Sequence, residues 1–375
     1  MKLLSLKAER FRSLRDETIP LNDLNLFIGV NASGKSTILD ALRFLCEGVQ
    51  ERDFRHSVSS RGGIVHLAWK GEDAQRINLT AQFEADARIF EWTISLKPAG
   101  FEFSVEEEVN EIKPGFPPEQ LLRANRGIGW WWSGVNEKVQ LKQGTTACGL
   151  AAAAADATFP ARGIAEFVNN WGFFDPSPFT LRRGLPGIES SKLDPYGRNL
   201  AERLYLLQKS APEIFAQIES ATQTVLGLPT AIEPRESDGR FYFVQKEPGL
   251  KHSVHQIGAS SGTLRILALM TALLEESGSG LIGIEEPENH IHPTALAGFA
   301  EYLEQAKSRV QILVTTHSPI LLDFMSDPTV VCVVRHTDQY GTKVDCEKNP
   351  EAMLSALAES GFGLGEFYQT TGFGG

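Results

Sequence analysis

The stretch Gly29-Val30-Asn31-Ala32-Ser33-Gly34-Lys35-Ser36 decides the fold of this chain. It fits the phosphate-loop pattern G-x-x-x-x-G-K-[ST]. The apolar run 24–28 precedes it and a helix-like stretch, 37–45, follows it, so the pattern stands between a strand and a helix as it requires. The alternative is an ordinary glycine-containing turn, and the strand–loop–helix context favours the phosphate loop.

Each residue type in this loop suits a nucleoside triphosphate. Gly29 and Gly34 let consecutive backbone N–H groups turn toward phosphate oxygens, and Lys35 can reach the β- and γ-phosphates. The hydroxyl of Ser36 can ligate Mg²⁺. The residues expected to contact the nucleotide in this loop are Gly29, Asn31, Ala32, Ser33, Gly34, Lys35, Ser36 and Thr37.

Length and composition indicate a soluble globular protein. The chain has 375 residues, of which 42% are hydrophobic and 22% charged, enough for one large domain or two smaller ones. It has no apolar run of about twenty residues, and its N-terminus carries charges where a signal peptide is apolar. We therefore expect a cytoplasmic protein that does not span a membrane.

The charge pattern predicts no dominant nucleic-acid-binding surface. The net charge is −11, and the 36 Lys and Arg residues are spread along the chain without a run. The sequence does not exclude a local basic patch that forms only in the fold or in a dimer. Direct DNA binding is therefore one alternative.

The four cysteines, Cys46, Cys148, Cys332 and Cys346, lie far apart and have no C-x-x-C spacing. Neither a zinc site nor a disulfide framework is indicated. We expect reduced thiols that are mostly buried.

The first half of the chain predicts mainly strands. Residues 1–28 indicate a strand, a turn over 12–20 and a second strand that leads into the phosphate loop. Strand patterns then recur at 64–69, 77–83 and 89–94, which predicts an antiparallel sheet with one solvated face.

The region 110–160 is rich in Pro, Gly and Ala, which predicts an irregular insertion. Its tryptophans, 130–132, form either an exposed patch for a partner or a cap over a local core, and we favour the cap. Helical apolar spacing at 163–174 and 199–226 predicts a lid or arm.

The last part of the chain predicts a parallel α/β sheet, because helices alternate with continuous apolar strands. The predicted elements are a helix over 262–276, a strand over 281–284, a helix from Pro293 and a strand over 310–315. We expect three parts: an N-terminal lobe with the phosphate loop and an antiparallel β subdomain (1–110), a helical insertion or lid (111–228) and a C-terminal lobe (229–375).

Polar residues follow two of these strands at the carboxyl edge, where such sheets bind ligands. Glu285 and Glu286 close the strand 281–284, as a Mg²⁺-organising acid followed by a water-activating acid would. His317 follows the next strand and could donate a hydrogen bond to a γ-phosphate. A surface turn and a structural histidine are the alternatives, and the phosphate loop favours the catalytic interpretation.

Two further groups are open to both a structural and a functional interpretation. Ser260, Ser261 and Gly262 precede a helix, so Ser260 is first an N-cap and second a candidate phosphate contact. His290 and His292 have poor spacing for zinc, and His292 before Pro293 fits the entry to a helix.

These residues resemble the ABC-type ATPases of the RecF and SMC group, and within it the stand-alone ATPases called AAA15 or OLD-like. The resemblance rests on four motifs in the expected order: Phe11-Arg12-Ser13-Leu14 with the phosphate loop, 260–265 as the signature segment, 285–289 as Walker B, and 315–319 with the switch histidine. It covers nearly the whole chain.

The resemblance implies a homodimer, or a higher homo-oligomer, with ATP between the phosphate loop of one subunit and Ser260 and Gly262 of the other. It implies that Lys35 and Ser36 bind phosphate and Mg²⁺, that Glu285 assists the metal, that Glu286 is the general base and that His317 contacts the γ-phosphate. Gln82 as the glutamine-loop residue, and Arg10 and Arg12 near the nucleotide, are weaker implications.

The chain departs from the family pattern at two positions, since Glu285 stands where Asp is usual and Ser261 where Asp or Gly is usual. Only 58 residues follow His317, so we expect no nuclease domain and a separate effector protein. The favoured function is a nucleotide-dependent switch in antiviral defence or DNA maintenance. The alternatives are an ATP-gated scaffold with little hydrolysis and a repair ATPase that binds DNA directly.

Overall fold

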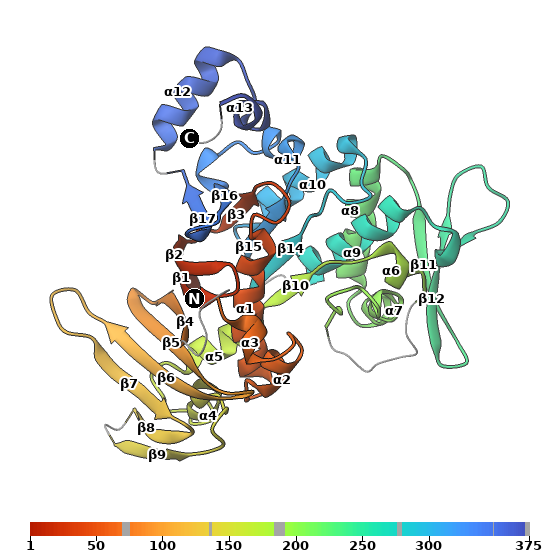
Figure 1. The fold of residues 1–375 in the computed structure, drawn as a ribbon. Coiled ribbons are helices and arrows are strands. Elements are labelled where there is room, and N and C mark those ends of the chain that lie inside the picture. Colours follow the sequence, from red (N-terminus) through yellow and green to blue (C-terminus); the bar gives the residue numbers. More distant parts are fainter. Residues whose placement is uncertain (70–75, 135–136, 184–191, 276–279, 348, 372–375) are drawn as a thin grey trace. The chain divides into compact units, whose positions relative to one another are not determined.

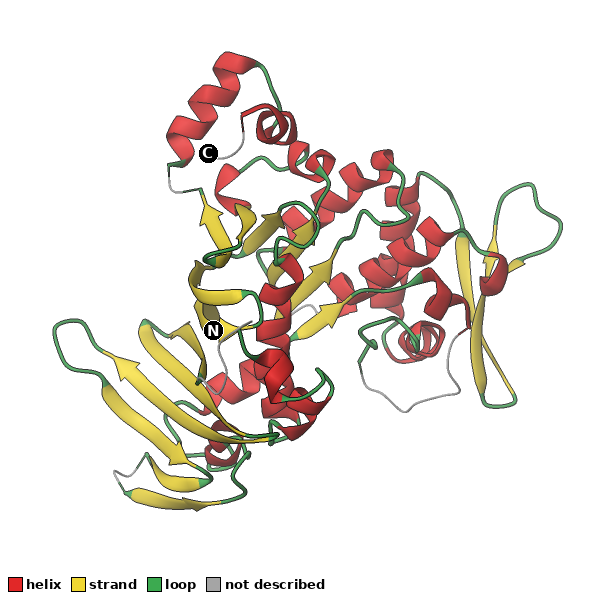
Figure 2. Ribbon diagram, in the orientation of Figure 1, coloured by secondary structure: helices red, strands yellow, loops and turns green. Residues whose placement is uncertain are grey.

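The computed structural model describes residues 1–69, 76–134, 137–183, 192–275, 280–347 and 349–371. The chain forms two compact units, each assembled from separate stretches of sequence. The first unit comprises Met1–Trp171, Ser279–Leu281 and Cys332–Cys346, and the second comprises Gly172–Gly278, Ile282–Val331 and Glu347–Gly375. Figures 1 and 2 show their helices and strands.

The first unit is built on a long sheet whose strands follow the order β3-β16-β17-β2-β1-β4-β5-β6-β7-β8-β9. Neighbouring strands from β16 to β9 are antiparallel. The strands are β1 (Lys2–Phe11), β2 (Leu14–Pro20), β3 (Leu24–Ile28), β4 (Ile77–Ala85), β5 (Arg88–Ala99), β6 (Glu102–Ile112), β7 (Glu119–Asn125), β8 (Ile128–Trp132), β9 (Lys138–Lys142), β16 (Val331–Thr337) and β17 (Gly341–Cys346).

Helices pack against one face of this sheet, and several of its strands bury the alternate residues that lie on that face. In β4, Ile77, Leu79, Ala81 and Phe83 are buried, while the residues between them form a half-exposed polar face. The predicted antiparallel sheet with one solvated face is thereby confirmed. The helices are α1 (Lys35–Gln50), α2 (Arg55–Ser59), α3 (Ile64–Leu67), α4 (Gly149–Ala153) and α5 (Arg162–Asn169).

Three predictions for this unit are wrong. The predicted turn over 12–20 is mostly strand β2, because the charged residues between Leu14 and Ile19 hide its alternation. The predicted strand 64–69 is the short helix α3, in which Ile64 and Leu67 are buried one turn apart. The predicted irregular insertion contains β7, β8 and β9, which extend the sheet.

The three tryptophans are half-buried and divide between the two faces of β8. Trp131 pairs with the buried Leu122, and its indole N–H donates to Asp156 Oδ2 over 3.3 Å. Trp130 and Trp132 lie on the other face with ring centroids 5.9 Å apart, and the Lys138 ammonium is 4.1 Å from the first ring.

The hairpin of β16 and β17 corrects the prediction of reduced thiols. Cys332 and Cys346 are partners in its register and form a disulfide. Cys46 and Cys148 are buried thiols outside this disulfide, as expected. The pairing is invisible in the sequence because it depends on where the hairpin turns, and no cysteine spacing signals that.

The second unit combines a parallel α/β layer with a small separate sheet. β10 (Gly172–Phe174) pairs in parallel with β14 (Leu281–Glu285), and β15 (Gln311–Thr316) is completely buried. The small antiparallel sheet consists of β11 (Ala231–Ser237), β12 (Arg240–Lys246) and β13 (Val254–His255).

One helix of this unit, α9 (Ser261–Glu275), is buried on nearly all sides. The others are α6 (Pro178–Arg183), α7 (Leu200–Ser210), α8 (Pro212–Leu226), α10 (Pro293–Ala306), α11 (Pro319–Asp323), α12 (Pro350–Ser360) and α13 (Leu364–Thr371). Short 3-10 turns occupy Gln256–Gly258 and Pro328–Val330.

Most predicted elements of this unit are confirmed, including the strands at 281–284 and 310–315 and the helix from Pro293. The predicted helix 163–174 is wrong in its last part, since α5 ends at Asn169 and residues 172–174 form β10. The predicted helical stretch 199–226 is two helices, because Pro212 cannot continue α7 and begins α8 instead.

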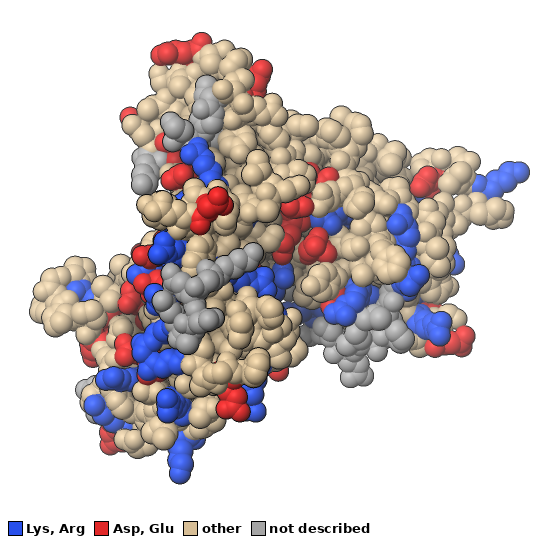
Figure 3. Space-filling model, viewed as in Figure 1, with Lys and Arg blue, Asp and Glu red and all other residues tan. Residues whose placement is uncertain are grey.

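No helix among the described residues is both long and apolar enough to cross a membrane. On the face shown in Figure 3, Lys and Arg side chains over the sheet of the first unit alternate with Asp and Glu. This mixture agrees with the absence of a basic run in the sequence.

Glu107 is a buried charge that fastens α4 to the sheet of the first unit. Its side chain is on the covered face of β6, and burial raises the pKa of its carboxyl. The carboxylate accepts hydrogen bonds from Trp92 Nε1 over 2.8 Å, from Leu150 N over 2.9 Å and from Gly149 N.

We predict that Glu107→Gln lowers the free energy of unfolding by roughly 1–3 kcal/mol, because the amide –NH2 must face an N–H donor. Denaturant unfolding measures this loss. Glu108→Gln is the matched control, since the neighbouring side chain is 43% exposed on the other face. Equal losses for the two variants would contradict a role for the buried hydrogen bonds.

Candidate functional site

The phosphate loop of the first unit joins β3 to α1 in a tight turn. The N–H of Ser33 donates to the Val30 carbonyl over 3.2 Å, and the N–H of Thr37 to the Gly34 carbonyl over 3.0 Å. Ala32 and Gly34 have φ angles of 62° and 104°, in the left-handed region. Gly34 is also the N-cap of α1, so the loop ends at a helix N-terminus.

Both motif glycines are required by close neighbours from the hairpin of β16 and β17. A Cβ on Gly29 would lie 2.2 Å from the Val334 carbonyl oxygen. A Cβ on Gly34 would lie 1.9 Å from Thr342 Oγ1. The glycines therefore serve contact with this hairpin as well as backbone freedom.

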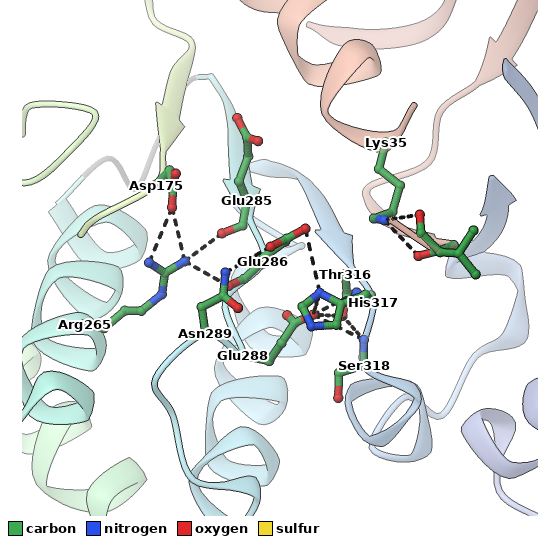
Figure 4. A network of polar contacts seen from close by, with 12 residues as sticks. Lys35, Asp175, Arg265, Glu285, Glu286, Glu288, Asn289, Thr316, His317 and Ser318 are labelled. Atoms are coloured by element: carbon green, nitrogen blue, oxygen red, sulfur yellow. Dashed lines mark hydrogen bonds and ion pairs between the residues drawn. The ribbon is translucent and has the colours of Figure 1, made fainter. Parts of the chain in front are cut away.

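The side chain of Lys35 folds back over the loop. Its side chain is buried, and Nζ donates to the carbonyl oxygens of Gly29 and Val30 over 2.8 and 3.0 Å (Figure 4). Ser36 is exposed at the start of α1. Ser33 Oγ is buried and has no hydrogen-bond partner among the described residues. A fixed ammonium, an exposed hydroxyl and an unsatisfied polar atom in one loop fit a bound phosphate and Mg²⁺.

In the second unit, the two predicted carboxylates mark a sharp turn at the end of β14. Glu285 is the last residue of the strand and is half-buried. Glu286 has a φ of 43°, and its N–H donates to the Thr315 carbonyl over 2.9 Å. Its Oε2 accepts from Asn289 Nδ2 over 2.9 Å, which fixes the carboxylate.

Glu288 joins the end of β14 to the end of β15 (Figure 4). Its Oε1 accepts from Thr316 Oγ1 over 2.7 Å, from His317 N over 2.8 Å and from Ser318 N over 3.2 Å. Its side chain is only 8% exposed, and its Oε2 has no partner among the described residues. A buried carboxylate with three donors fixes the backbone on both sides of His317.

The imidazole of His317 lies between two carboxylates and is 43% exposed. Its Nδ1 is 3.2 Å from Glu288 Oε1 and 3.7 Å from Glu286 Oε1. The structure thus brings together Glu286 and His317, which are 31 residues apart in sequence.

Arg265 supports the same turn from α9. Its side chain is 2% exposed, and Nη2 donates to the carbonyl oxygens of Glu285 and Glu286, each over 2.8 Å. Asp175 lies 3.4 Å from the guanidinium, and burial lowers the pKa of Arg265. Arg265 therefore connects α9 to the turn after β14.

Ser260 is the N-cap of α9, as predicted. Its Oγ accepts from the N–H of Thr263 over 3.0 Å. Ser260 is exposed and Gly262 is half-exposed at the start of this 15-residue helix. The second prediction for these residues, a phosphate contact, stays a prediction.

The remaining candidates have structural partners. His292 caps α10, with Nδ1 accepting from the N–H of Thr294 over 3.3 Å, which confirms the helix-entry prediction. Arg12 pairs with Asp40 over 3.1 Å. Gln82 lies within β4 and donates to Glu91. Within the described ranges, no group of three or more His, Cys, Asp or Glu side chains is placed to hold a metal ion.

Sequence reasoning missed the roles of three residues in these sites. Glu288 lies within the segment that resembles Walker B, and Arg265 is a charged residue in an otherwise apolar helix. Each of these signals could have identified its residue from the sequence. Thr342 gave no signal, because only the fold brings it to the phosphate loop.

The candidate residues fall into two sets, one in each unit. The phosphate loop, residues 29–37, belongs to the first unit, and Ser260, Gly262, Glu285, Glu286 and His317 belong to the second.

Two families match the sequence. The family described as "AAA domain, putative AbiEii toxin, Type IV TA system" matches residues 135–323, more than half of the chain. The family described as "AAA ATPase domain" matches residues 1–137. No curated protein matches the chain.

Solved structures of Smc head domains are similar in fold. An Smc head bound to the C-winged helix domain of ScpA has a TM-score of 0.61 at 13% identity, covering 94% of this chain and 100% of that chain. An Smc head with an extended coiled coil, bound to a ScpA domain derived from Pyrococcus furiosus, has a TM-score of 0.54 at 13% identity. This match covers 96% of this chain and 99% of that chain. The predicted fold, an ABC-type α/β head with a mixed sheet, is confirmed.

We predict that Gly29→Ala lowers the free energy of unfolding by about 2 kcal/mol or more, because the new methyl group overlaps the Val334 carbonyl. Denaturant unfolding followed by fluorescence measures the change. Gly144→Ala is the matched control, since a Cβ there has its nearest contact, Arg55, at 3.8 Å. If Gly29→Ala is as stable as Gly144→Ala, the close approach of the hairpin is wrong.

Proposed function

The chain belongs to the AAA-domain family that matches residues 135–323, as its resemblance to the RecF and SMC group predicts, and on this premise we propose that it binds and hydrolyses ATP. The observation that carries the proposal is the placement of Glu286 and His317 at two neighbouring strand ends, with Glu288 fixing the histidine. A carboxylate and an imidazole held in this way suit the hydrolysis of a γ-phosphate.

The phosphate loop supplies the binding half of this chemistry. Lys35 would neutralise charge on the β- and γ-phosphates. The N–H groups of the loop other than those of Ser33 and Thr37, which donate within the loop, would donate to phosphate oxygens. Ser36 and Glu285 would hold Mg²⁺, the serine directly and the carboxylate through the water shell of the metal. Bound Mg²⁺ neutralises the charge that develops on the phosphate oxygens.

Glu286 is the proposed general base. Asn289 holds one of its oxygens, which leaves the other, 3.7 Å from His317, to orient and polarise the attacking water. His317 would donate to the γ-phosphate.

We further propose that the complete site forms between two subunits. Ser260 and Gly262 of the partner subunit would then contact the γ-phosphate through the N-terminus of α9. Their exposure at the start of a long helix supports this role. A homodimer, or a higher homo-oligomer, would thus form only around bound ATP.

Such a dimer would act as a switch for a separate effector. The matching family is described as a putative toxin of a Type IV TA system. This description supports a role in which the chain controls a second protein or is controlled by one. The similar Smc heads are seen with ScpA domains, which supports a protein partner. Antiviral defence or DNA maintenance is the proposed setting.

We predict that Glu286→Gln reduces steady-state ATP hydrolysis by about 100-fold or more while ATP binding is kept, because the amide cannot accept a proton from water. Phosphate release and nucleotide titration measure the two properties. Glu301→Gln, exposed on α10, is the matched control and should match the wild type. Equal, negligible rates for wild type and Glu286→Gln would instead support an ATP-gated scaffold.

A further inference from the structure

We infer that Thr342 is a positioning residue of the phosphate loop, although it is separated from the loop by some 300 residues of sequence. Its side chain is completely buried. Thr342 Oγ1 lies 2.9 Å from the carbonyl oxygen of Ser33 and 2.8 Å from Ser13 Oγ. Ser13 Oγ lies in turn 3.1 Å from Thr37 Oγ1, so three hydroxyl groups connect the middle and the end of the loop.

The direction of the hydrogen bond to Ser33 follows from the chemistry of the groups. A hydroxyl has one proton and a carbonyl oxygen only accepts. Thr342 therefore donates to the Ser33 carbonyl. Its contact with Ser13, and that of Ser13 with Thr37, each join two hydroxyl groups. Removing the Thr342 hydroxyl would leave the buried Ser33 carbonyl without this donor and would take one hydrogen-bond partner from the half-buried Ser13 hydroxyl.

Thr342 also occupies the space beside the second motif glycine. A Cβ on Gly34 would meet Thr342 Oγ1 at 1.9 Å and Thr342 Cγ2 at 2.8 Å. The carbonyl of Ser33 and the Cα of Gly34, two consecutive points of the loop, are thus both fixed by one side chain. These points set the direction of the N–H groups that precede Lys35.

The position of Thr342 is itself determined by rigid elements. Its N–H donates to the Ser13 carbonyl over 2.8 Å, and its neighbour Gly341 pairs with Leu14 of β2. A Cβ on Gly341 would lie 2.3 Å from the Ser13 carbonyl and from the Trp69 ring, so this approach also requires glycine. The hydroxyl is held by the sheet and not by the loop, as a positioning residue requires.

This inference rests on the proposed function, because the loop that Thr342 positions is the proposed ATP site. The residue would not touch ATP. It would act by keeping the loop in its binding shape before ATP arrives, which increases affinity by reducing the ordering that binding requires.

The test compares Thr342→Val, which keeps the shape and removes the hydroxyl, with Thr342→Ser, which keeps the hydroxyl. Thr337→Val is the matched control, because the Thr337 hydroxyl bonds within the turn of the same hairpin, to Gly341 O and Tyr340 N. Titration with a fluorescent ATP analogue should give about tenfold weaker binding for Thr342→Val, and binding within about threefold of wild type for Thr342→Ser and Thr337→Val.

Hydrogen exchange without nucleotide provides a second readout. The amides of residues 30–36 should exchange faster in Thr342→Val than in wild type, and at the wild-type rate in Thr337→Val. Unchanged exchange and unchanged affinity in Thr342→Val would overturn the inference. A wild type that binds no ATP would contradict the proposed function, and the exchange comparison would still decide the role of Thr342.

Discussion

The first unit depends on an approach between two chain segments that only glycine permits. The β16–β17 hairpin comes so close to the phosphate loop that a methyl group on Gly29 or Gly34 would overlap Val334 or Thr342. The loop and the hairpin, which joins a sheet that begins at residue 2, must therefore fit each other closely. This requirement explains why the first unit contains residues 332–346 in addition to the first 171.

The second unit fixes its functional residues with buried charges that bind backbone groups. Glu288 accepts from two backbone N–H groups beside His317, and Arg265 donates to two carbonyl groups beside Glu286. Hydrogen bonds between charged groups and the backbone are strong and directional in a buried setting. The two strand ends are thus held in a defined position although the loops after them are half-exposed, and a strained φ at Glu286 can persist there.

The sequence allowed correct predictions where a local pattern of residue types suits one structural or chemical role. The phosphate loop, the strands ending at Glu285 and Thr316 and the N-cap Ser260 could all be predicted from local patterns. Residues whose role depends on distant pairing could not. The disulfide of Cys332 and Cys346 needs the register of a hairpin, and the strands over 119–142 were hidden by their turns and by irregular composition. Thr342 lacks any local pattern, since its partners, Ser13 and Ser33, come from the other end of the chain.

The central claim is that each phosphate loop is half of a site that a second subunit completes. Lys35→Ala disables the loop, and Gly262→Leu places a side chain at the start of α9, where the partner's phosphate would bind. Neither variant alone should hydrolyse ATP. In an equal mixture, half of the dimers combine one variant of each kind, and each of these contains one intact composite site, so the ATPase rate should return to about a quarter of the wild-type rate. A mixture no more active than its separate components would contradict the claim.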